Sequence, residues 1–567
     1  MLSIDLRPST TVGGYSYYVS PIDERLLTIG TIVDDEVEIP NSRLVPLMDI
    51  LISDDITSPR KDVLKKLLKM KPKSLPEKRE VVLPKFKLQP RPHQVEAIKF
   101  AVEKERFLNC DEMGLGKTGS TMYTVELLKS YYDFKHCLVV CGINGAKYNW
   151  HQVEIPKFSY EKSHMIGSRI NRRGRFVVEG NDEKYEDLLK EHDEFYLIIN
   201  IESLRDERIS KQLQEMIFDG RIGVVVVDEI HKCKGHTSAQ GKAIQKLRPR
   251  FRFGLTGTPV HNKPLDVYNL LMWIGGEYRT FSDFRNEHCI EVPQQVVMNR
   301  RIVNFSKWVY KDLKPLHDQL SNIMIRRTVE LLNLPEPIFK TEFVDLYPQQ
   351  QKAYAIEKES ILEKLGSQTT LDNMHEKNPA VLFTRLRQIV SAPSTFGINQ
   401  DAKKDRMIEL CEELVESGKS VVIFTWFNET TFAYSKELRD KFPGNVVVVD
   451  KNTKNVQNAV TEFQEGSQQI LIGNLTKLGT SFTITKADYV IFIEKHVVWS
   501  DYKQAYMRVW RQGQTKTVVI IDIMAKDTID ERLEYLVQLG RSHSQQIVDG
   551  DEDISFYLDK YNLEDMI

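Results

Sequence analysis

The chain has 567 residues, of which 41% are hydrophobic and 28% are charged. This length predicts about three or four domains, and the composition excludes an extensively disordered protein or a membrane protein, because no stretch approaches the roughly 18 consecutive apolar residues of a membrane span. The 78 basic and 80 acidic residues leave a formal net charge of -2, so a nucleic acid would need a locally basic cleft.

The N-terminal stretch MLSIDLRPST has no basic segment followed by an apolar one, so it does not resemble a secretion signal. We therefore expect a protein that works inside a cell and has no membrane partner. The cysteines are scattered, without paired CxxC motifs or histidines at the spacing of metal ligands. Reduced, buried thiols are predicted for Cys110, Cys137, Cys141, Cys233, Cys289 and Cys411.

Residues 1–80 alternate short β-like runs with turn residues and then become strongly basic, as in RKDVLKKLLKMKPKSLPEKRE. We interpret them as an accessory module with a basic linker, and as the place where a protein partner would bind. In the linker, lysines could follow a phosphate backbone. The alternative is a solvated helix whose apolar stripe packs on a neighbour; that stripe consists of Val63, Leu64, Leu67 and Leu68.

Residues 81–260 contain a series of short, wholly apolar runs separated by helical patterns: HCLVVC, FYLIINI, GVVVVDE and FRFGLTGTP. Such runs predict buried parallel strands in an α/β sheet. Residues 401–545 contain a second series: SVVIFTWF, NVVVVD, QQILIGN, DYVIFIE and TKTVVIIDIM. We therefore predict an α/β fold with two parallel-sheet lobes of similar plan.

Between these lobes, residues 261–400 are mostly helical in pattern and carry aromatic residues, charges and the pair Arg326–Arg327. We expect a helical insertion rather than a short hinge. Residues 546–567 are acidic and are expected to form a tail.

The most specific motif is DEMGLGKTGS, between the predicted strand RFLNC and the helix-like TMYTVELLKS. A glycine-rich turn at this place lets backbone N–H groups and a helix N-terminus approach phosphates. Lys117 would reach the β- and γ-phosphates of ATP, and the Thr118 hydroxyl would hold Mg²⁺. A full P-loop has glycine in place of Asp111, so a purely structural turn is the alternative. The predicted nucleotide-binding residues of the turn are Met113, Gly114, Leu115, Gly116, Lys117 and Thr118.

The run GVVVVDEIH ends in two carboxylates. Next to a P-loop, one such carboxylate completes a Mg²⁺ site and the second can activate water. We assign Asp228 to the metal and Glu229 to the general base. His231 could couple the site to motion, or it could be an ordinary loop histidine.

Two further motifs flank these. FRFGLTGTPVHN places Thr256 and Thr258 at the end of a strand, where they could contact the nucleotide site. Gln94, in LQPRPHQVEAI, has an amide that can read the edge of adenine, and it precedes the P-loop.

The order Gln94, DEMGLGKT, DEIH and LTGTP, followed by Asn262, resembles the superfamily-two helicases. More narrowly, the chain is similar to the Swi/Snf family, through IMIRRTVELLNLPEP, YPQQQKAYAI, TRLRQIVSAP, SVVIFTWFNE, LIGNLTKLGTSFTITKADYVIFIEKHVVW and QAYMRVWRQGQTKTV. The resemblance spans residues 85–540. It implies two RecA-like lobes with a Swi/Snf-type insertion, using ATP and Mg²⁺.

The resemblance also implies that Arg508 and Arg511 reach from the second lobe toward the γ-phosphate, where a cation would stabilise the transition state. Gln504 and Gln514 flank them and could bridge the site and a nucleic acid, or lie on a surface helix. Two departures stand out: TKLGTSF keeps Gly479 but has Ser481 where the family often has glycine, and IRRTVELLNLP lacks the usual lysine after the arginine pair.

In motors of this type a nucleic acid crosses both lobes and is held mainly by its phosphates. Trp150 and Trp426 could stack on bases, or they could be core residues. The loop NRRGR, with Arg172, Arg173 and Arg175, could attract phosphates electrostatically, or it could be a solvated loop. The candidate contacts are Lys147, Trp150, Asn200, Thr425, Trp426, Thr476 and Lys477.

The favoured hypothesis is a DNA-dependent ATPase that translocates on duplex DNA and remodels DNA or protein–DNA complexes in repair, recombination or fork remodelling. Branched or single-stranded DNA are further candidate partners. A strand-separating helicase is one alternative, although no β-hairpin for that task is evident. A non-catalytic scaffold is another, although the chemical residues Lys117, Asp228, Glu229, Arg508 and Arg511 are present. The style of the relatives suggests the cytoplasm of a bacterium or of a virus-infected host rather than a nucleus.

Overall fold

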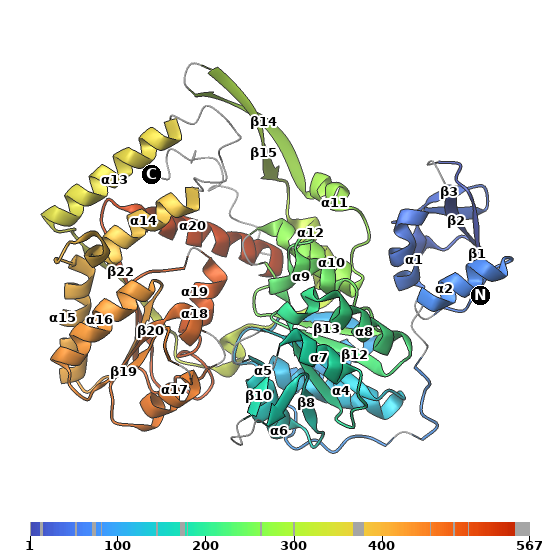
Figure 1. Cartoon of the computed structure of the whole chain (residues 1–567), viewed down its shortest axis with the longest axis horizontal. Helices are drawn as coiled ribbons and strands as arrows, with labels where there is room; N and C mark the ends of the chain where they lie inside the picture. The colour runs from blue at the N-terminus through green and yellow to red at the C-terminus, as the bar shows by residue number, and fades with distance from the viewer. Residues whose placement is uncertain are drawn as a thin grey trace.

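The computed structural model contains two lobes, each built on a parallel sheet, and a smaller N-terminal module (Figure 1). This confirms the predicted α/β fold class. Within the described part of the chain, no helix is long and apolar enough to cross a bilayer. The structure describes residues 2–549 except 12–14, 52–53, 71–74, 81, 143–145, 171–175, 179, 261–262, 299–300, 367–378, 454, 480–481 and 497.

The first lobe is built on a seven-stranded parallel sheet in the order β16-β6-β13-β12-β7-β11-β8. Alternate residues of its strands belong to two separate hydrophobic clusters, so both faces are buried, as the apolar runs predicted. The strands are β6 (Arg106–Asn109), β7 (His136–Cys141), β8 (Ser163–Met165), β11 (Tyr196–Asn200), β12 (Ile222–Asp228), β13 (Phe251–Leu255) and β16 (Met324–Ile325). A separate antiparallel pair is formed by β9 (Ser168–Ile170) and β10 (Phe176–Val178). The helices are α3 (Pro92–Lys104), α4 (Lys117–Tyr131), α5 (Ala146–Asn149), α6 (Ile155–Phe158), α7 (Asn181–Leu188), α8 (Glu207–Phe218), α9 (Ala239–Ile244) and α10 (Tyr268–Ile274).

The second lobe repeats this plan with a six-stranded parallel sheet in the order β17-β22-β21-β18-β20-β19. Again, neighbouring residues of a strand enter different clusters on the two faces. Its strands are β17 (Ile338–Val344), β18 (Val421–Thr425), β19 (Val446–Val449), β20 (Ile470–Asn474), β21 (Tyr489–Phe492) and β22 (Val519–Ala525). Its helices are α15 (Ala402–Glu416), α16 (Asn428–Lys441), α17 (Val456–Glu465), α18 (Leu475–Leu478), α19 (Trp499–Tyr506) and α20 (Ile529–Ser544).

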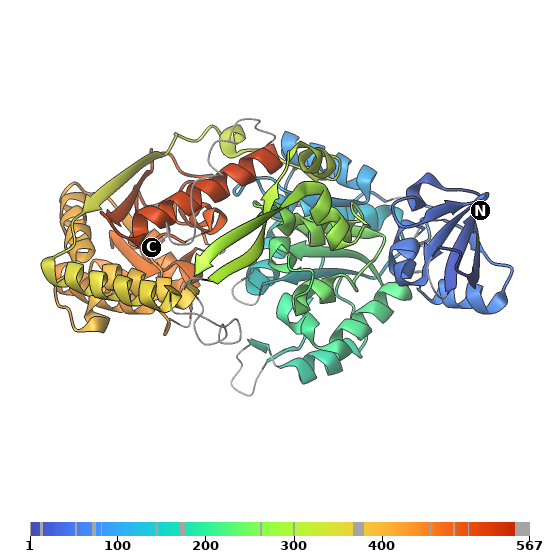
Figure 2. The same ribbon diagram turned by 90° about the horizontal axis from the view of Figure 1, so that it is seen from above.

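The region 261–400, which we expected to be mostly helical, contains strands as well as helices. It contains helices α11 (Phe281–His288), α12 (Lys314–Ser321), α13 (Pro348–Gly366) and α14 (Pro379–Ser391), but also an antiparallel pair of strands, β14 (Cys289–Met298) and β15 (Arg301–Tyr310). β16 and β17 from this region complete the sheets of the two lobes. Val- and Ile-rich runs favour strands even where charged residues surround them. The long hairpin β14–β15 projects from the first lobe toward the second (Figures 1 and 2).

The N-terminal module has a five-stranded sheet in the order β3-β4-β2-β1-β5. Val63 and Leu67 of α2 are buried in its core, which confirms the alternative that the apolar stripe packs on a neighbour. The side chain of Leu68 lies outside the described residues. The elements are β1 (Leu2–Pro8), β2 (Tyr15–Ser20), β3 (Thr31–Val33), β4 (Glu36–Pro40), β5 (Ile56–Thr57), α1 (Leu44–Ile50) and α2 (Lys61–Met70).

A buried carboxylate joins this module to the first lobe. Asp49 of α1 is 3% exposed. It forms ion pairs with Arg248 at 2.6 Å and with Arg252 at 2.8 Å, and it accepts a hydrogen bond from Tyr278 at 3.0 Å. Burial alone would raise the pKa of Asp49, but Arg252, Arg248 and Arg106 hold it well below its usual value. The module is therefore docked on the lobe, at the end away from the second lobe (Figure 1).

The chain returns to the first lobe after α20. Ile547 and Val548 are buried in the hydrophobic cluster of the first lobe, and His317 of that lobe lies 3.0 Å from the Ile547 carbonyl oxygen. We expected a tail from residue 546, but residues up to 549 are held in place by this apolar contact. The contact could not be predicted from the acidic composition of this segment, because it depends on residues far away in the sequence. Residues 550–567 lie outside the described part.

Candidate nucleotide site between the two lobes

The predicted glycine-rich turn connects β6 to α4, as the motif required. Gly114 and Gly116 have φ values of 89° and 80°, in the left-handed region that favours glycine. α4 begins at Lys117, and Thr118 is its second residue. Backbone N–H groups at the start of this helix are therefore available to phosphate oxygens.

The Lys117 ammonium lies against the turn. Its Nζ donates to the carbonyl oxygens of Asp111 at 2.7 Å and Glu112 at 3.3 Å. Burial lowers the pKa of Lys117, while Glu229 and Asp111 oppose that effect. A partly buried ammonium whose hydrogen bonds go to backbone carbonyl oxygens is suited to an anionic ligand such as a phosphate.

Gln94 contacts the turn directly. Its Nε2 donates to the Gly116 carbonyl oxygen at 3.2 Å, and its Oε1 accepts from the Arg91 N–H at 3.0 Å. The residue is 5% exposed. The structure thus places Gln94 beside the turn, with its amide paired to the backbone.

The two carboxylates at the end of β12 have different surroundings. Asp228 Oδ2 accepts a hydrogen bond from Trp150 Nε1 at 2.9 Å. Burial and the neighbouring Glu229 raise the pKa of Asp228 above its usual range. A cation would relieve this penalty, and the hard oxygen donors of Asp228 and Thr118 suit Mg²⁺.

Glu229 has a φ of 52°, an uncommon backbone conformation for a residue other than glycine. Its Oε1 accepts from Gln504 Nε2 of the second lobe at 3.0 Å. Its Oε2 is buried and accepts no hydrogen bond within the described residues, although His231 Nδ1 lies 3.3 Å away. One oxygen of this carboxylate is therefore poised to accept a hydrogen bond from a ligand or water.

His231 links the end of β12 to the end of β13. Its Nδ1 lies 3.0 Å from Thr256 Oγ1, which in turn accepts from the Thr258 N–H at 3.1 Å. Burial lowers the pKa of His231 to about 3, so the imidazole is neutral near pH 7. The structure brings together the three predicted residues of these two motifs.

The two arginines of the second lobe are held by one loop. Arg508 Nε donates to the Gly479 carbonyl oxygen at 3.0 Å, and Arg511 Nη1 donates to the Phe482 carbonyl oxygen at 3.1 Å. Burial lowers the pKa of Arg508 to about 10, with Arg511 adding to the effect, while Glu229 opposes it. Gln514 is buried and donates to the carbonyl oxygens of Thr485 and Ala487, each at 3.1 Å, so it has a structural role rather than a surface one.

The second lobe covers the glycine-rich turn. Met113 packs against a hydrophobic cluster of that lobe. A Cβ placed on Gly114 would lie 3.8 Å from Arg511 Cβ. Met113 and the arginines therefore meet in the same interface, as a nucleotide site shared by two lobes requires.

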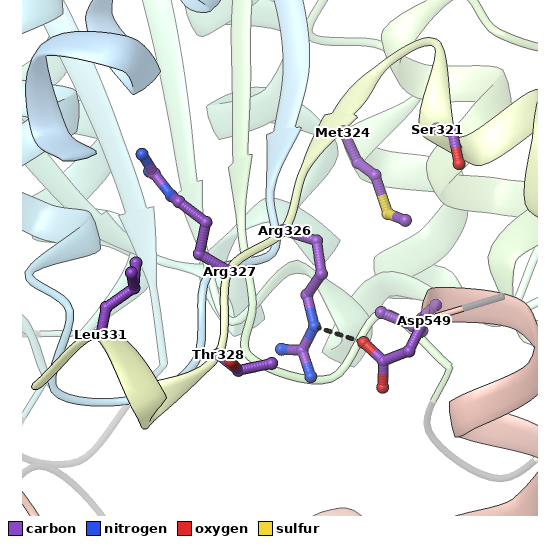
Figure 3. Close-up of a pocket in the computed structure, with 8 residues that line it drawn as sticks. Ser321, Met324, Arg326, Arg327, Thr328, Leu331 and Asp549 are labelled. Carbon is purple, nitrogen blue, oxygen red and sulfur yellow. Dashed lines mark hydrogen bonds and ion pairs between the residues drawn. The ribbon is translucent and has the colours of Figure 1, made fainter. Parts of the chain in front are cut away.

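A pocket of about 540 Å³ opens beside this turn, around Arg326 (Figure 3). Arg326 Nη2 pairs with Glu112 at 2.9 Å and Arg326 Nε pairs with Asp549 at 3.0 Å. Arg327 points away from the pocket and pairs with the buried Asp111. None of the residues that line the pocket is a predicted nucleotide ligand, so we do not place ATP there. The lining residues are Ser321, Met324, Arg326, Arg327, Thr328, Leu331, Val548 and Asp549.

Three of the residues predicted to contact a nucleic acid have buried side chains that contact other protein groups. Trp150 lies in the core of the first lobe and binds Asp228. Asn200 accepts from Lys184 and Ser203, each at 3.0 Å. Thr425 is fully buried and lies 2.6 Å from Thr431.

The remaining candidates differ in what they contact. Lys477 Nζ donates to the Asp450 and Lys451 carbonyl oxygens at 2.8 and 2.9 Å and thereby holds that loop. Thr476 is exposed, and half-buried Trp426 packs against His496. Lys147 is half-buried on α5. The predictions for Arg172, Arg173, Arg175, Asn262 and Ser481 lie outside the described residues.

Two lysines that sequence reasoning missed lie near Lys147, at the carboxyl edge of the first sheet. Lys147 and Lys232 both lie near Cys141, at the end of β7, and both lower the pKa of its thiol against the larger effect of burial. Lys184 is buried, and Lys147 adds to the lowering of its pKa that burial causes. Their positions in the sequence could have indicated these lysines, because Lys147 follows β7 and Lys232 follows β12. Ligands of open α/β sheets bind at this carboxyl edge.

One group elsewhere has the composition of a metal site: His164, Asp187 and His192. Asp187 already accepts hydrogen bonds from His164 Nε2 at 2.7 Å and from the Gly167 N–H at 2.8 Å. His192 Nε2 lies 2.9 Å from the Asp187 carbonyl oxygen. These atoms satisfy one another, so we assign no metal to this group.

Comparison with protein families gives two matches. Residues 93–395, more than half of the chain, match the SNF2-related domain, and residues 402–513 match the helicase conserved C-terminal domain. An uncharacterised ATP-dependent helicase of Mycoplasma pneumoniae is 26% identical over an alignment of 493 residues that covers 82% of this chain and 43% of the relative. The DNA repair and recombination protein RAD54-like of Drosophila pseudoobscura pseudoobscura is 23% identical over an alignment of 538 residues that covers 84% of this chain and 66% of the relative.

This chain spans about half the length of the first curated relatives it matches. Among solved structures, it is similar to the Sulfolobus solfataricus SWI2/SNF2 ATPase core in complex with double-stranded DNA. That similarity has 20% sequence identity and a TM-score of 0.36, and it covers 83% of this chain and 96% of the other.

Proposed function

The chain belongs to the SNF2-related family of ATP hydrolases, and we propose that it uses ATP to move along duplex DNA by opening and closing its two lobes. One observation carries the proposal: Gln504 of the second lobe donates to Glu229 of the first at 3.0 Å. The candidate base is therefore completed only when the lobes meet. A site built in this way couples hydrolysis to closure.

For ATP, the proposed roles follow the geometry. The turn from Met113 to Thr118 holds the phosphates, and Lys117 moves from the backbone carbonyls to the β- and γ-phosphates. Gln94 reads adenine from its position beside the turn. Glu229 accepts a proton from water as the water oxygen bonds to the γ-phosphorus and ADP leaves, while the cations Arg508 and Arg511 stabilise the developing charge.

For the metal, Asp228 and Thr118 would hold Mg²⁺, which supplies charge neutralisation at the phosphate oxygens. Trp150 orients Asp228 through the 2.9 Å hydrogen bond. A carboxylate fixed in this way would offer the metal a preoriented oxygen ligand.

For DNA, we propose that the phosphate backbone crosses the carboxyl edge of the first sheet, where Lys147 and Lys232 lie, and continues to Thr476 on the second lobe. Phosphate contacts of this kind are independent of sequence. The printed title of the Sulfolobus relative, which names double-stranded DNA, supports a duplex partner. Branched or single-stranded DNA remain alternative substrates.

The wider role we propose is remodelling of DNA or protein–DNA complexes in repair, recombination or fork remodelling, which the RAD54-like relative supports. We propose that the chain divides into an accessory module at 1–80 that binds a protein partner, two lobes at 81–260 and 401–545, and a connecting region at 261–400. The bacterial relatives support our expectation of a bacterial or virus-infected cytoplasm. The hairpin β14–β15 is a candidate for an element that separates DNA strands. The alternative function of a strand-separating helicase is therefore also tested.

The direct experiment measures phosphate release with duplex DNA, single-stranded DNA, RNA or no nucleic acid, with Glu229→Gln as the inactive control. We expect the strongest stimulation by duplex DNA and a loss of about 10² or more in rate for the control. Stimulation by RNA alone would contradict the duplex assignment. Equal activity of Glu229→Gln would contradict the proposed base.

A further inference from the structure

Glu112, at the base of the glycine-rich turn, is held from both halves of the molecule. Its Oε1 accepts from Arg326 Nη2 at 2.9 Å and also pairs with Lys503 Nζ of α19. Its Oε2 accepts from the Val329 N–H at 2.9 Å. Lys503 lies on the second lobe, and the Val329 side chain packs in a hydrophobic cluster of that lobe, whereas Arg326 directly follows β16 of the first sheet.

Glu112 is connected to the phosphate-binding lysine. The Glu112 and Asp111 carbonyl oxygens both accept from Lys117 Nζ. The Glu112 N–H donates to the Arg327 carbonyl oxygen at 2.9 Å, so its backbone is fixed on the other side as well. A shift of Glu112 would therefore move the acceptors that hold Lys117.

Helix α19 contacts the site at two adjacent positions. Lys503 pairs with Glu112, and Gln504 donates to Glu229 at 3.0 Å. Neighbouring residues of a helix point about 100° apart. Two contacts in different directions fix both the height and the rotation of α19 over the site, which one contact cannot do.

The Lys503–Glu112 pair is shielded from water. Glu112 is 6% exposed and the Lys503 side chain is 20% exposed. Burial alone would raise the pKa of Glu112, but Lys503 and then Arg326 lower it, so the carboxylate is ionised near pH 7. A pair in such surroundings is screened little by salt, unlike an exposed pair.

We propose that Lys503 is a positioning residue that locks the second lobe onto the turn through Glu112, so that hydrolysis waits for lobe closure. This inference rests on the proposed function. When the lobes separate, Glu112 keeps Arg326, which directly follows β16 of the first sheet, and the turn stays ready to bind ATP. When they close, Lys503 completes the cluster and α19 brings Gln504 to Glu229.

The test compares Lys503→Ala with Lys503→Arg, and with Lys526→Ala as the matched control. Lys526 pairs with Asp345 at 3.5 Å, away from the nucleotide site, so its loss removes a lysine from the second lobe without touching the cluster around Glu112. Thermal unfolding verifies that each variant is folded.

Closure is measured by energy transfer between dyes on Lys211→Cys in α8 and Lys436→Cys in α16. Both positions are exposed, and the six native cysteines are buried, so labelling is selective. The probe is the non-hydrolysable analogue AMP-PNP. The wild type should change its transfer efficiency on adding AMP-PNP, and Lys503→Ala should lose at least half of that change.

In steady-state kinetics we expect Lys503→Ala to lower kcat about ten-fold with less than a three-fold change in KM for ATP, because closure rather than initial binding is impaired. Lys503→Arg should restore at least half of the wild-type kcat. Normal closure of Lys503→Ala, or an equal defect in Lys526→Ala, would overturn the inference. If DNA does not stimulate the wild type, the proposed function fails, while the AMP-PNP-induced change still decides the role of Lys503.

Discussion

Gln504 Nε2 lies 3.0 Å from Glu229 Oε1, although the residues are 275 positions apart and belong to different lobes. The other oxygen of Glu229 accepts no hydrogen bond within the described residues. The amide thus occupies one oxygen and leaves the second for water. The proposed base would lose this orientation when the lobes part, so this one contact would tie the chemistry to the motion.

Replacing Gln504 tests this relationship. Gln504→Ala should lower kcat about ten-fold with a smaller effect on ATP binding, because the base is present but not oriented. Gln504→Glu should be worse, since two carboxylates at this separation repel and raise the pKa of one of them. The acid limb of its pH–rate profile should therefore move to higher pH. Unchanged kcat in both variants would show that the contact does not orient the base.

Trp150→Phe separates two roles of the indole. If Trp150 orients Asp228 through its N–H, phenylalanine keeps the ring but loses the donor, and half-maximal activity should need several-fold more Mg²⁺. Affinity for duplex DNA should be unchanged, because the ring is buried. If the ring stacked on a base, phenylalanine would retain function and alanine would weaken DNA binding.

The limits of sequence reasoning are visible in Trp150 and Lys503. Asp228 and Glu229 could be predicted because they end a wholly apolar strand, and the same pattern located the strands of both sheets. The direction of the Trp150 side chain depends on packing in three dimensions, so its burial could not be read locally. Lys503 and Glu112 are 391 positions apart, and only the closed arrangement of the lobes brings them together. The hairpin β14–β15 could have been predicted from its valines and isoleucines.

Lys232→Ala tests the proposed DNA path. The variant should bind duplexes of any sequence more weakly, and the slope of log affinity against log salt should decrease by about 0.9 if one phosphate contact is lost. Lys234→Ala is the matched control, because Lys234 is nearby but pairs with Asp266 at 2.8 Å. Equal effects of the two substitutions would indicate general electrostatics rather than a contact.

Asp49→Asn should undock the N-terminal module. Removing one partner of a buried ion-pair cluster costs about 3–5 kcal/mol, because the remaining charges stay buried. Amide hydrogen exchange in α1 should therefore accelerate, while the ATPase rate without a protein partner stays near that of the wild type. Unchanged exchange in α1 would contradict the docking role of Asp49.

The effect of Asp49 also depends on pH, with a definite sign. Because its folded pKa is depressed, its stabilisation is fully present above the unfolded pKa of about 3.9 and is lost as the pH falls through the folded pKa. The difference in the free energy of docking between the wild type and Asp49→Asn should be constant from about pH 5 to about pH 8. It should become smaller only below about pH 4. A difference that narrows near neutral pH would contradict the arginine cluster as its cause.

The most direct test of ATP-driven movement on duplex DNA is displacement of the third strand from a triplex, compared with separation of a forked duplex. The account predicts that the wild type displaces the third strand with ATP, that Glu229→Gln does not, and that the forked duplex stays paired. Separation of the forked duplex without displacement of the third strand would contradict movement on duplex DNA. It would indicate instead that the protein uses ATP to separate strands.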